Sequence, residues 1–112
     1  MTIGIYKITN LINNKIYIGQ SIHIERRWQE HKKPSSCSCI GQAIKKYGIN
    51  NFSFEIIEEC PTNRLAEREK YWINYFNTLV PNGYNVLDET ESNASIYHCF
   101  DKQILLNIIF DL

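Results

Sequence analysis

The sequence lacks any apolar stretch long enough to cross a membrane. A spanning helix needs about 20 consecutive apolar residues, and no run in these 112 residues approaches that length. The amino terminus also lacks the basic and then apolar segment, with its small-residue cleavage site, that marks a secretory signal. We therefore expect an intracellular protein, in the cytoplasm or in the compartment that holds the nucleic acid of the host, with no membrane partner.

Cysteines are few, and their spacing suits neither a disulfide framework nor a common zinc motif. Only Cys37 and Cys39 are close together, and a single residue separates them, whereas zinc pairs usually leave two to four. Cys60 and Cys99 stand apart. Free thiols are therefore expected. A zinc site made by Cys37 and Cys39, with His98 and Cys99, is the alternative that stays open.

Repeats and low-complexity tracts are also missing, so the chain has the character of a compact globular protein. Hydrophobic residues make up 44% and charged residues 21% of the sequence, which is ordinary globular usage. A length of 112 residues suits one domain. We expect one folded domain over residues 1–87. Residues 88–112 then form an acidic and later apolar tail, in which Ile104 to Phe110 would pack on the domain or on a partner.

Net charge is absent from the whole chain but not from its parts. Residues 1–87 hold 11 Lys and Arg against 7 Asp and Glu, which is +4, and residues 88–112 hold 1 against 5, which is −4. A local basic face can contact several phosphates, although basic clusters also occur on proteins with no nucleic-acid role. The candidate DNA contacts lie between residues 15 and 46: Lys15, Arg26, Lys32, Lys33, Lys45 and Lys46.

Alternating hydrophobic residues predict a hairpin near the amino terminus. Strands are expected over residues 3–8 and 15–19. Asn13 and Asn14 lie between them and tolerate left-handed turn angles. The two strands would then pair antiparallel and bring Tyr6 and Tyr17 close together.

Three helices and a third strand are predicted after the hairpin, at about residues 21–33, 40–47, 62–77 and, for the strand, 52–57. Ser21 is the expected cap of the first helix, and Thr62 or Asn63 of the third. Gly48 would end the second helix. The fold class that follows is α/β (α+β): a three-stranded antiparallel sheet flanked by helices, with the functional residues gathered on one side.

Six positions match a known pattern in order and spacing. Gly4-Ile5-Tyr6 and Tyr17-Ile18-Gly19 stand on the two hairpin strands, and Arg27 and His31 lie one turn apart on the first helix. Glu69 follows on a later helix, and Asn85 ends an Asn-Gly-Tyr-Asn turn. In these residues the sequence resembles the GIY-YIG endonucleases, above all the phage and intron-encoded homing enzymes. The resemblance implies the GIY-YIG fold and DNA cleavage.

The chemistry of these residues suits phosphodiester hydrolysis. Glu69 is a hard oxygen ligand for Mg²⁺, with Mn²⁺ as a substitute, and one carboxylate implies one metal ion. Arg27 can donate two hydrogen bonds to the scissile phosphate. Tyr6 is the candidate for activating water, which would require its pKa of ~10 to fall under nearby positive charge. His31 would take up or relay that proton.

The remaining assignments are weaker when each residue is considered alone. Tyr17 would orient water or phosphate, and Asn85 would hold another active-site group in place. Strand tyrosines are usually packing residues, and a mid-helix glutamate usually faces solvent or pairs with a lysine. Glu67 competes with Glu69 for the metal, but a separation of two residues puts it on another helix face.

The chain departs from the homing enzymes in two respects. Some of them carry a further histidine soon after the first helix, where this chain has Pro34 to Cys39. They also continue into separate DNA-recognition modules, so we expect little intrinsic sequence specificity here, and a homodimer or a targeting protein as partner. Three alternatives stay open: a catalytically weak, partner-dependent DNA-binding module, a structure-specific repair or recombination nuclease, and an interaction protein unrelated to nucleic acid.

Overall fold

A three-stranded antiparallel sheet forms the centre of the structure, a computed structural model that describes residues 1–33 and 39–86. The hairpin strands β1 (Gly4–Asn10) and β2 (Ile16–Ser21) pair with Tyr6 opposite Gly19 and Ile8 opposite Tyr17. Asn14 turns the chain between them with a φ of 64°, as its side chain allows. β3 (Phe52–Glu59) pairs with the other side of β1, so the strand order is β2-β1-β3. The predicted sheet is confirmed.

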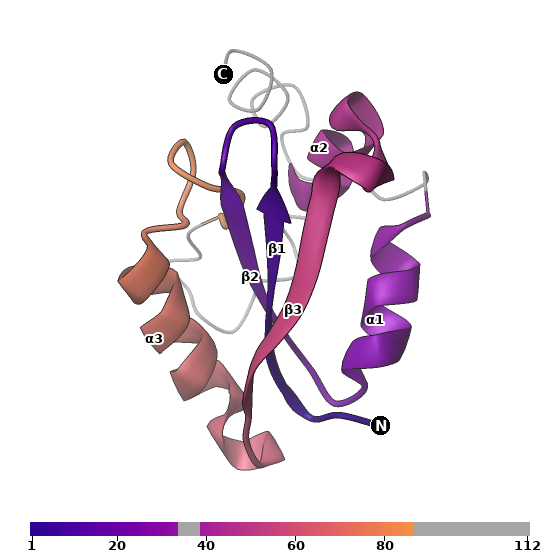
Figure 1. Ribbon diagram of the computed structural model, residues 1–112. Coiled ribbons are helices and arrows are strands. Elements are labelled where there is room, and N and C mark those ends of the chain that lie inside the picture. The colour runs from indigo at the N-terminus through magenta and orange to yellow at the C-terminus, as the bar shows by residue number, and fades with distance from the viewer. Residues whose placement is uncertain (34–38, 87–112) are drawn as a thin grey trace.

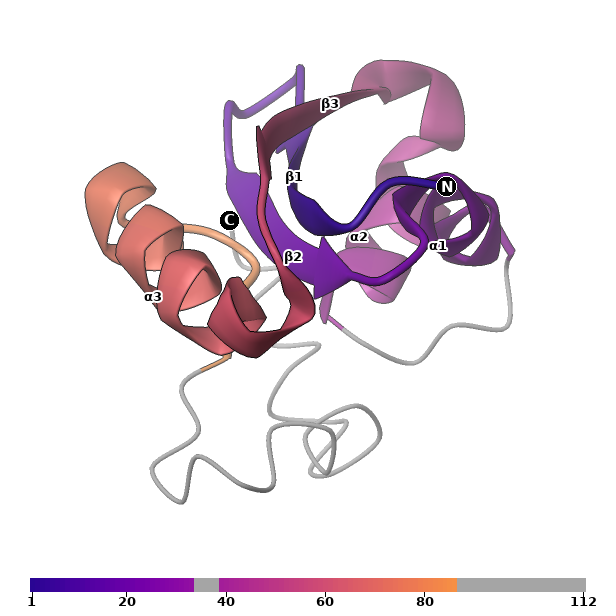
Figure 2. The same cartoon turned by 90° about the horizontal axis from the view of Figure 1, so that it is seen from below.

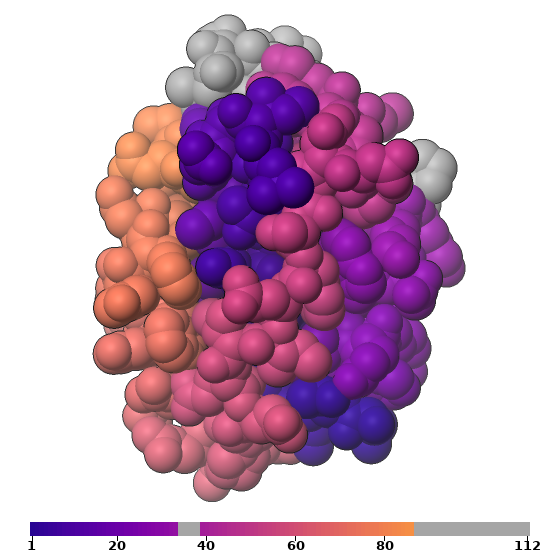
Figure 3. Space-filling model, viewed as in Figure 1, coloured from indigo at the N-terminus to yellow at the C-terminus, as the bar shows by residue number. Residues whose placement is uncertain are grey.

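Helices cover both faces of this sheet and produce three layers (Figures 1 and 2). The helices α1 (Ile24–His31) and α2 (Cys39–Tyr47) lie on one face, and α3 (Leu65–Phe76) lies on the other. Seen from the β3 edge, the space-filling surface has α3 and α1 on opposite flanks of the strands (Figure 3). The predicted fold class, an α+β sandwich with flanking helices, is therefore confirmed.

Strand alternation divides the core in two. Tyr6 and Ile8 of β1 point to the α1 and α2 face, where they pack with Ile24, Ile40 and other buried residues. Ile5 of β1 and Ile18 of β2 point to the other face of the sheet, where they pack against Leu65 of α3. Because successive strand side chains alternate between faces, one strand supplies both cores. Tyr6 and Tyr17 therefore share the α1 face.

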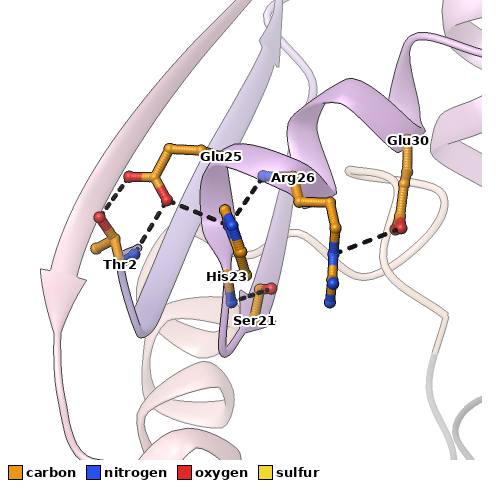
Figure 4. A network of polar contacts seen from close by, with 6 residues as sticks. All are labelled: Thr2, Ser21, His23, Glu25, Arg26 and Glu30. Carbon is orange, nitrogen blue, oxygen red and sulfur yellow. Dashed lines mark hydrogen bonds and ion pairs between the residues drawn. The ribbon is translucent and has the colours of Figure 1, made fainter.

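The first helix begins later than the sequence predicted. Ser21 does not cap it, because its hydroxyl accepts a hydrogen bond from the His23 N–H instead. His23 is the cap, and its Nδ1 accepts from the Arg26 N–H at 3.2 Å. The carboxylate of Glu25 also holds the segment before β1, because it accepts hydrogen bonds from the Thr2 N–H and hydroxyl (Figure 4). The start of α1 is thus tied to the chain that leads into β1.

The third helix also differs at its start. Thr62 and Asn63 belong to a short 3-10 turn, η2 (Thr62–Arg64), and α3 has no side-chain cap. Its carboxyl end at Asn77 takes left-handed angles. A second 3-10 turn, η1 (Ile49–Asn51), follows Gly48, whose φ of 88° ends α2 as predicted.

Several earlier expectations concern parts of the chain outside the described residues: Cys37, His98 and Cys99 of the zinc alternative, and the tail over residues 88–112. Cys39 is a buried free thiol, and burial raises its pKa to about 11. Within the described ranges, no helix is both long and apolar enough to span a bilayer.

Candidate active site

Two tyrosines and a histidine form a compact group between the hairpin and α1. The Tyr6 hydroxyl and His31 Nε2 are 2.8 Å apart. The ring centroid of His31 lies 5.7 Å from that of Tyr6 and 5.6 Å from that of Tyr17, and the two tyrosine centroids are 6.2 Å apart. Tyr6 is fully buried and His31 nearly so, whereas Tyr17 is partly exposed. Sequence reasoning predicted this association.

Gly19 makes room for the Tyr6 ring. The two residues are opposite each other in the sheet, and a Cβ at position 19 would lie 2.3 Å from Tyr6 Cζ and 2.4 Å from its hydroxyl oxygen. Gly4 is crowded for another reason, because a Cβ there would meet the Glu58 carbonyl oxygen of β3 at 2.0 Å. Both glycines of the tripeptides thus permit close contacts that any side chain would prevent.

Burial keeps the Tyr6 hydroxyl protonated. The pKa of Tyr6 is raised well above its usual value, first by burial and then by Tyr17, while the charge of Arg27 opposes the shift. Burial likewise raises the pKa of Tyr17. The sequence-based condition that the Tyr6 pKa falls is therefore not met in the protein alone. Desolvation of a phenolate at this depth outweighs one partly exposed cation.

Arg27 lies on the α1 side of this group and is held by its own helix. Its Nη1 donates to Glu30 Oε1 at 3.0 Å, and the two side chains are 33% and 44% exposed. An exposed ion pair of this kind contributes little to stability. The charge of Arg27 nevertheless influences both tyrosines, because it lowers the pKa of Tyr6 and of Tyr17 against the effect of burial.

Glu69 reaches the site from the opposite face of the sheet. It lies in the middle of α3, and its Oε1 accepts a hydrogen bond of 3.1 Å from Gln20 Nε2 on the edge strand β2. Its negative charge raises the pKa of both Tyr6 and Tyr17. The functional residues therefore come from both faces and meet around the β2 edge, and the expectation of a one-sided group was wrong in this respect.

The environment of the Glu69 carboxylate suits a metal ligand. Burial raises its pKa, and no ion pair with a basic residue involves it within residues 1–33 and 39–86. The same residues contain no group of three His, Cys, Asp or Glu that could hold a metal, so Glu69 would supply the one protein carboxylate. Its rival Glu67 is exposed and paired with Arg64 at 2.7 Å.

Asn85 acts on the backbone of β2. Its Nδ2 donates to the Ile18 carbonyl at 2.8 Å, and its Oδ1 accepts from the Ile18 N–H at 2.8 Å and from the Thr78 hydroxyl at 2.7 Å. Ile18 stands between Tyr17 and Gly19, so Asn85 fixes the strand that carries both. The amide is buried and its hydrogen bonds go to protein groups, which makes Asn85 a positioning residue.

The predicted DNA contacts are mostly on the α1 and α2 side. Arg26 lies on α1, Lys32 and Lys33 directly follow that helix, and Lys45 and Lys46 lie in the last turn of α2. All five of these side chains are exposed. Lys15 differs, because its Nζ donates to the Pro81 carbonyl at 2.7 Å and its pKa is lowered by burial.

Gln20 is the residue of this site that sequence reasoning missed. It directly follows Tyr17-Ile18-Gly19, and strand alternation puts it on the α3 face, where Glu69 is expected. That neighbourhood was the available signal. This signal was insufficient, because the local sequence of a helix or of a strand does not determine how the two pack along each other.

Comparison with known proteins decides the family. A family model described as the GIY-YIG catalytic domain matches residues 2–85. The chain belongs to the GIY-YIG family. Intron-associated endonuclease 1 of Enterobacteria phage T4 is 35% identical over 94% of this chain and 45% of that protein. The putative endonuclease segB of the same phage is 49% identical over 72% of the chain and 36% of its own length. The chain thus spans less than half the length of these curated relatives.

A solved structure agrees with this GIY-YIG assignment. The catalytic domain of homing endonuclease I-TevI superposes with a TM-score of 0.66 at 37% identity, over 77% of this chain and 99% of that one. A mutant of the same domain gives a TM-score of 0.67. The sheet and three helices described above are therefore those of a GIY-YIG catalytic domain.

Proposed function

We propose that this GIY-YIG chain is an endonuclease that hydrolyses DNA phosphodiester bonds with the help of a divalent metal. The observation that carries the proposal is the meeting of Tyr6, His31 and Tyr17 with Arg27 and Glu69 around the β2 edge. The tyrosines and the histidine can remove a proton from water, Arg27 can stabilise charge on the phosphate, and Glu69 can bind a metal ion. Metal-assisted phosphodiester hydrolysis uses all three functions.

The metal role falls to Glu69. A partly buried carboxylate without a basic partner among the described residues suits Mg²⁺ or Mn²⁺, which take one carboxylate together with water and substrate phosphate. A bound divalent ion would polarise the phosphate and stabilise the charge that develops during hydrolysis. The chain's own task is to hold the Glu69 carboxylate in place.

The proton relay runs from the partly exposed Tyr17 through Tyr6 to His31. Because burial keeps both phenols protonated, neither has to exist as a phenolate. As the attacking water gives its proton to the Tyr17 oxygen, Tyr17 passes its own proton to Tyr6. Tyr6 then delivers a proton to Nε2 of a neutral His31 across the 2.8 Å contact.

Arg27 would leave Glu30 for the scissile phosphate. Its present ion pair is exposed and therefore weak, whereas a phosphate accepts two charge-assisted hydrogen bonds from one guanidinium. The basic side chains of α1 and α2 would hold the DNA backbone on the same side, through contacts that carry no sequence information. Little intrinsic specificity follows.

The first test is cleavage of supercoiled plasmid by the purified chain with Mg²⁺ or Mn²⁺, beside an EDTA control. Glu69→Ala and Tyr6→Phe should each lose about 10²-fold or more in rate. Glu67→Ala is the matched control, because it removes an exposed carboxylate from the same helix and should nick at the wild-type rate. An inactive wild type, on plasmid and on branched DNA, would refute the proposal for the isolated chain.

Two alternative functions are separated by the same preparation. A structure-specific nuclease would cut branched or flapped DNA much faster than plain duplex. A DNA-binding module that depends on a homodimer or a targeting protein would bind duplex with strong salt dependence and cleave only when that partner is added. The intact set of Tyr6, Arg27 and Glu69 favours catalysis by this chain, because binding alone needs no metal carboxylate.

A further inference from the structure

Gln20 occupies a position that connects the two halves of the site. It lies on the edge strand β2, opposite Ile5 of β1, and therefore faces α3. Its Nε2 donates to Glu69 Oε1 at 3.1 Å. Within residues 1–33 and 39–86 this is the sole hydrogen bond to the Glu69 carboxylate, which leaves Oε2 without a protein partner there.

A carboxylate on a helix needs such a partner to hold one orientation. Glutamate has three rotatable side-chain bonds, and holding it in one orientation costs side-chain conformational entropy. Groups that hydrogen-bond a ligating side chain orient it, and their loss typically reduces metal affinity about 10- to 100-fold. A neutral amide is well suited to this role. It donates a hydrogen bond to the carboxylate but carries no positive charge, so the negative charge of Glu69 stays available to the metal ion.

We propose that Gln20 is the positioning residue for Glu69, holding Oε1 so that Oε2 is presented to the divalent metal. The inference rests on the proposed function, since it concerns the same carboxylate. It assigns Gln20 no contact with the reacting atoms. Its role is exerted through Glu69, and it makes the strand that carries Tyr17 and Gly19 also fix the metal ligand on α3.

The test is Mn²⁺ binding in the absence of DNA, measured by the electron paramagnetic resonance signal of the free ion. Gln20→Met keeps the length of the side chain and removes the donor, so its Mn²⁺ dissociation constant should rise about tenfold or more. Gln29→Met is the matched control, because Gln29 is exposed on α1, and its affinity should equal that of wild type. Glu69→Gln should abolish site-specific binding.

Each outcome decides a separate question. If Glu69→Gln leaves Mn²⁺ binding unchanged, the metal role of Glu69 fails, and with it the proposed function. If Glu69→Gln abolishes binding while Gln20→Met binds like wild type, only the role of Gln20 is refuted. A thermal melt of the metal-free proteins completes the test: a purely structural hydrogen bond would lower Tm in Gln20→Met without moving the Mn²⁺ affinity.

Activity gives an independent readout. With Gln20→Met, the Mn²⁺ concentration for half-maximal cleavage should rise about as much as the dissociation constant, and the rate at saturating Mn²⁺ should stay close to that of wild type. A fall in the saturated rate with unchanged metal dependence would overturn the proposal, because it would place Gln20 in the reaction itself.

Discussion

Tyr6 belongs both to the hydrophobic core and to the proposed proton relay. Its ring fills the space beside Gly19 and Phe54, and its hydroxyl meets His31 rather than water. A buried phenol with a hydrogen-bond partner is stable only in its neutral form. In the proposed relay, the same burial that contributes to folding would let Tyr6 carry protons without becoming a permanent base.

The raised pKa of Tyr6 predicts a loss of stability in alkali. An unfolded tyrosine ionises near pH 10, whereas folded Tyr6 keeps its proton to a higher pH. Above about pH 10 the unfolded state thus binds fewer protons than the native state, and the free energy of unfolding falls by up to about 1.4 kcal/mol per pH unit for this one group. Urea midpoints between pH 7 and 11 measure the effect.

Two variants isolate the contribution of Tyr6. Tyr6→Phe should be less stable at neutral pH, because His31 loses a hydrogen-bond partner. Above pH 10, however, its free energy of unfolding should fall less steeply with pH than that of wild type, by up to about 1.4 kcal/mol per pH unit. Tyr75→Phe changes a tyrosine that is 65% exposed and should follow the wild-type curve. Parallel curves for wild type and Tyr6→Phe would contradict a strongly raised pKa.

Gly19 offers a second prediction at this scale. In Gly19→Ala the new methyl group would overlap the Tyr6 ring, and such overpacking costs about 1–3 kcal/mol. Because the displaced group is Tyr6, cleavage per folded molecule should also fall, by at least about tenfold.

Gly48→Ala is the control for Gly19→Ala. The φ of 88° at Gly48 strains any side chain, yet the added Cβ would meet no atom closer than 3.8 Å. Gly48→Ala should therefore lose stability and keep its activity per folded molecule. Full activity of folded Gly19→Ala would show that Tyr6 can move without consequence.

Among the elements, the edge strand β2 carries Tyr17 and Gln20, and the loop that contains Asn85 holds this strand in place. The Tyr84 N–H donates to the Ile16 carbonyl at 3.0 Å, and Asn85 takes both backbone groups of Ile18. An edge strand is otherwise free to fray or to pair with another chain. The loop thus completes β2 on the side away from β1.

Asn85→Ala should consequently weaken β2. It leaves the buried N–H and carbonyl of Ile18 without partners, and each such loss costs about 1–3 kcal/mol. The unfolding free energy and the cleavage rate should both fall, whereas Asn82→Ala, an exposed change in the same loop, should stay within about 0.5 kcal/mol of wild type. Chemical denaturation with a parallel plasmid assay measures both. If Asn85→Ala had the unfolding free energy and cleavage rate of wild type, Asn85 would have no role in holding β2 or the site.

The sequence predicted the elements that depend on local patterns and missed those that depend on contacts between distant segments. The hairpin, the third strand and the end of α2 at Gly48 follow from local patterns, because alternation and glycine angles are properties of short segments. The cap of α1 was wrong, since Ser21 bonds to His23 and the helix begins two residues later than expected. The Gln20–Glu69 contact depends on how α3 lies along β2, and it joins residues 49 positions apart.

At the scale of the whole molecule, charge divides along the chain. Residues 1–87 carry +4 and residues 88–112 carry −4, and the exposed basic side chains of α1 and α2 belong to the positive part. Electrostatic attraction to DNA depends on the summed field within a screening length, about 10 Å at 0.1 M salt and 3 Å at 1 M. Acidic residues on the same chain should therefore weaken DNA binding at low salt.

Removing the acidic charges of residues 88–112 tests whether they weaken DNA binding, without shortening the chain. The changes are Asp→Asn and Glu→Gln at the five acidic positions, and they bring the net charge from 0 to +5: Asp88, Glu89, Glu91, Asp101 and Asp111. In a Glu69→Ala background with EDTA, which should suppress cleavage, fluorescence anisotropy with a labelled duplex should show several-fold tighter binding near 0.05 M salt. The gain should disappear as salt screens the charges. Equal affinities at low salt would mean that the tail does not influence the basic face, whereas a gain that persists at high salt would indicate direct contact with DNA rather than a change in the field.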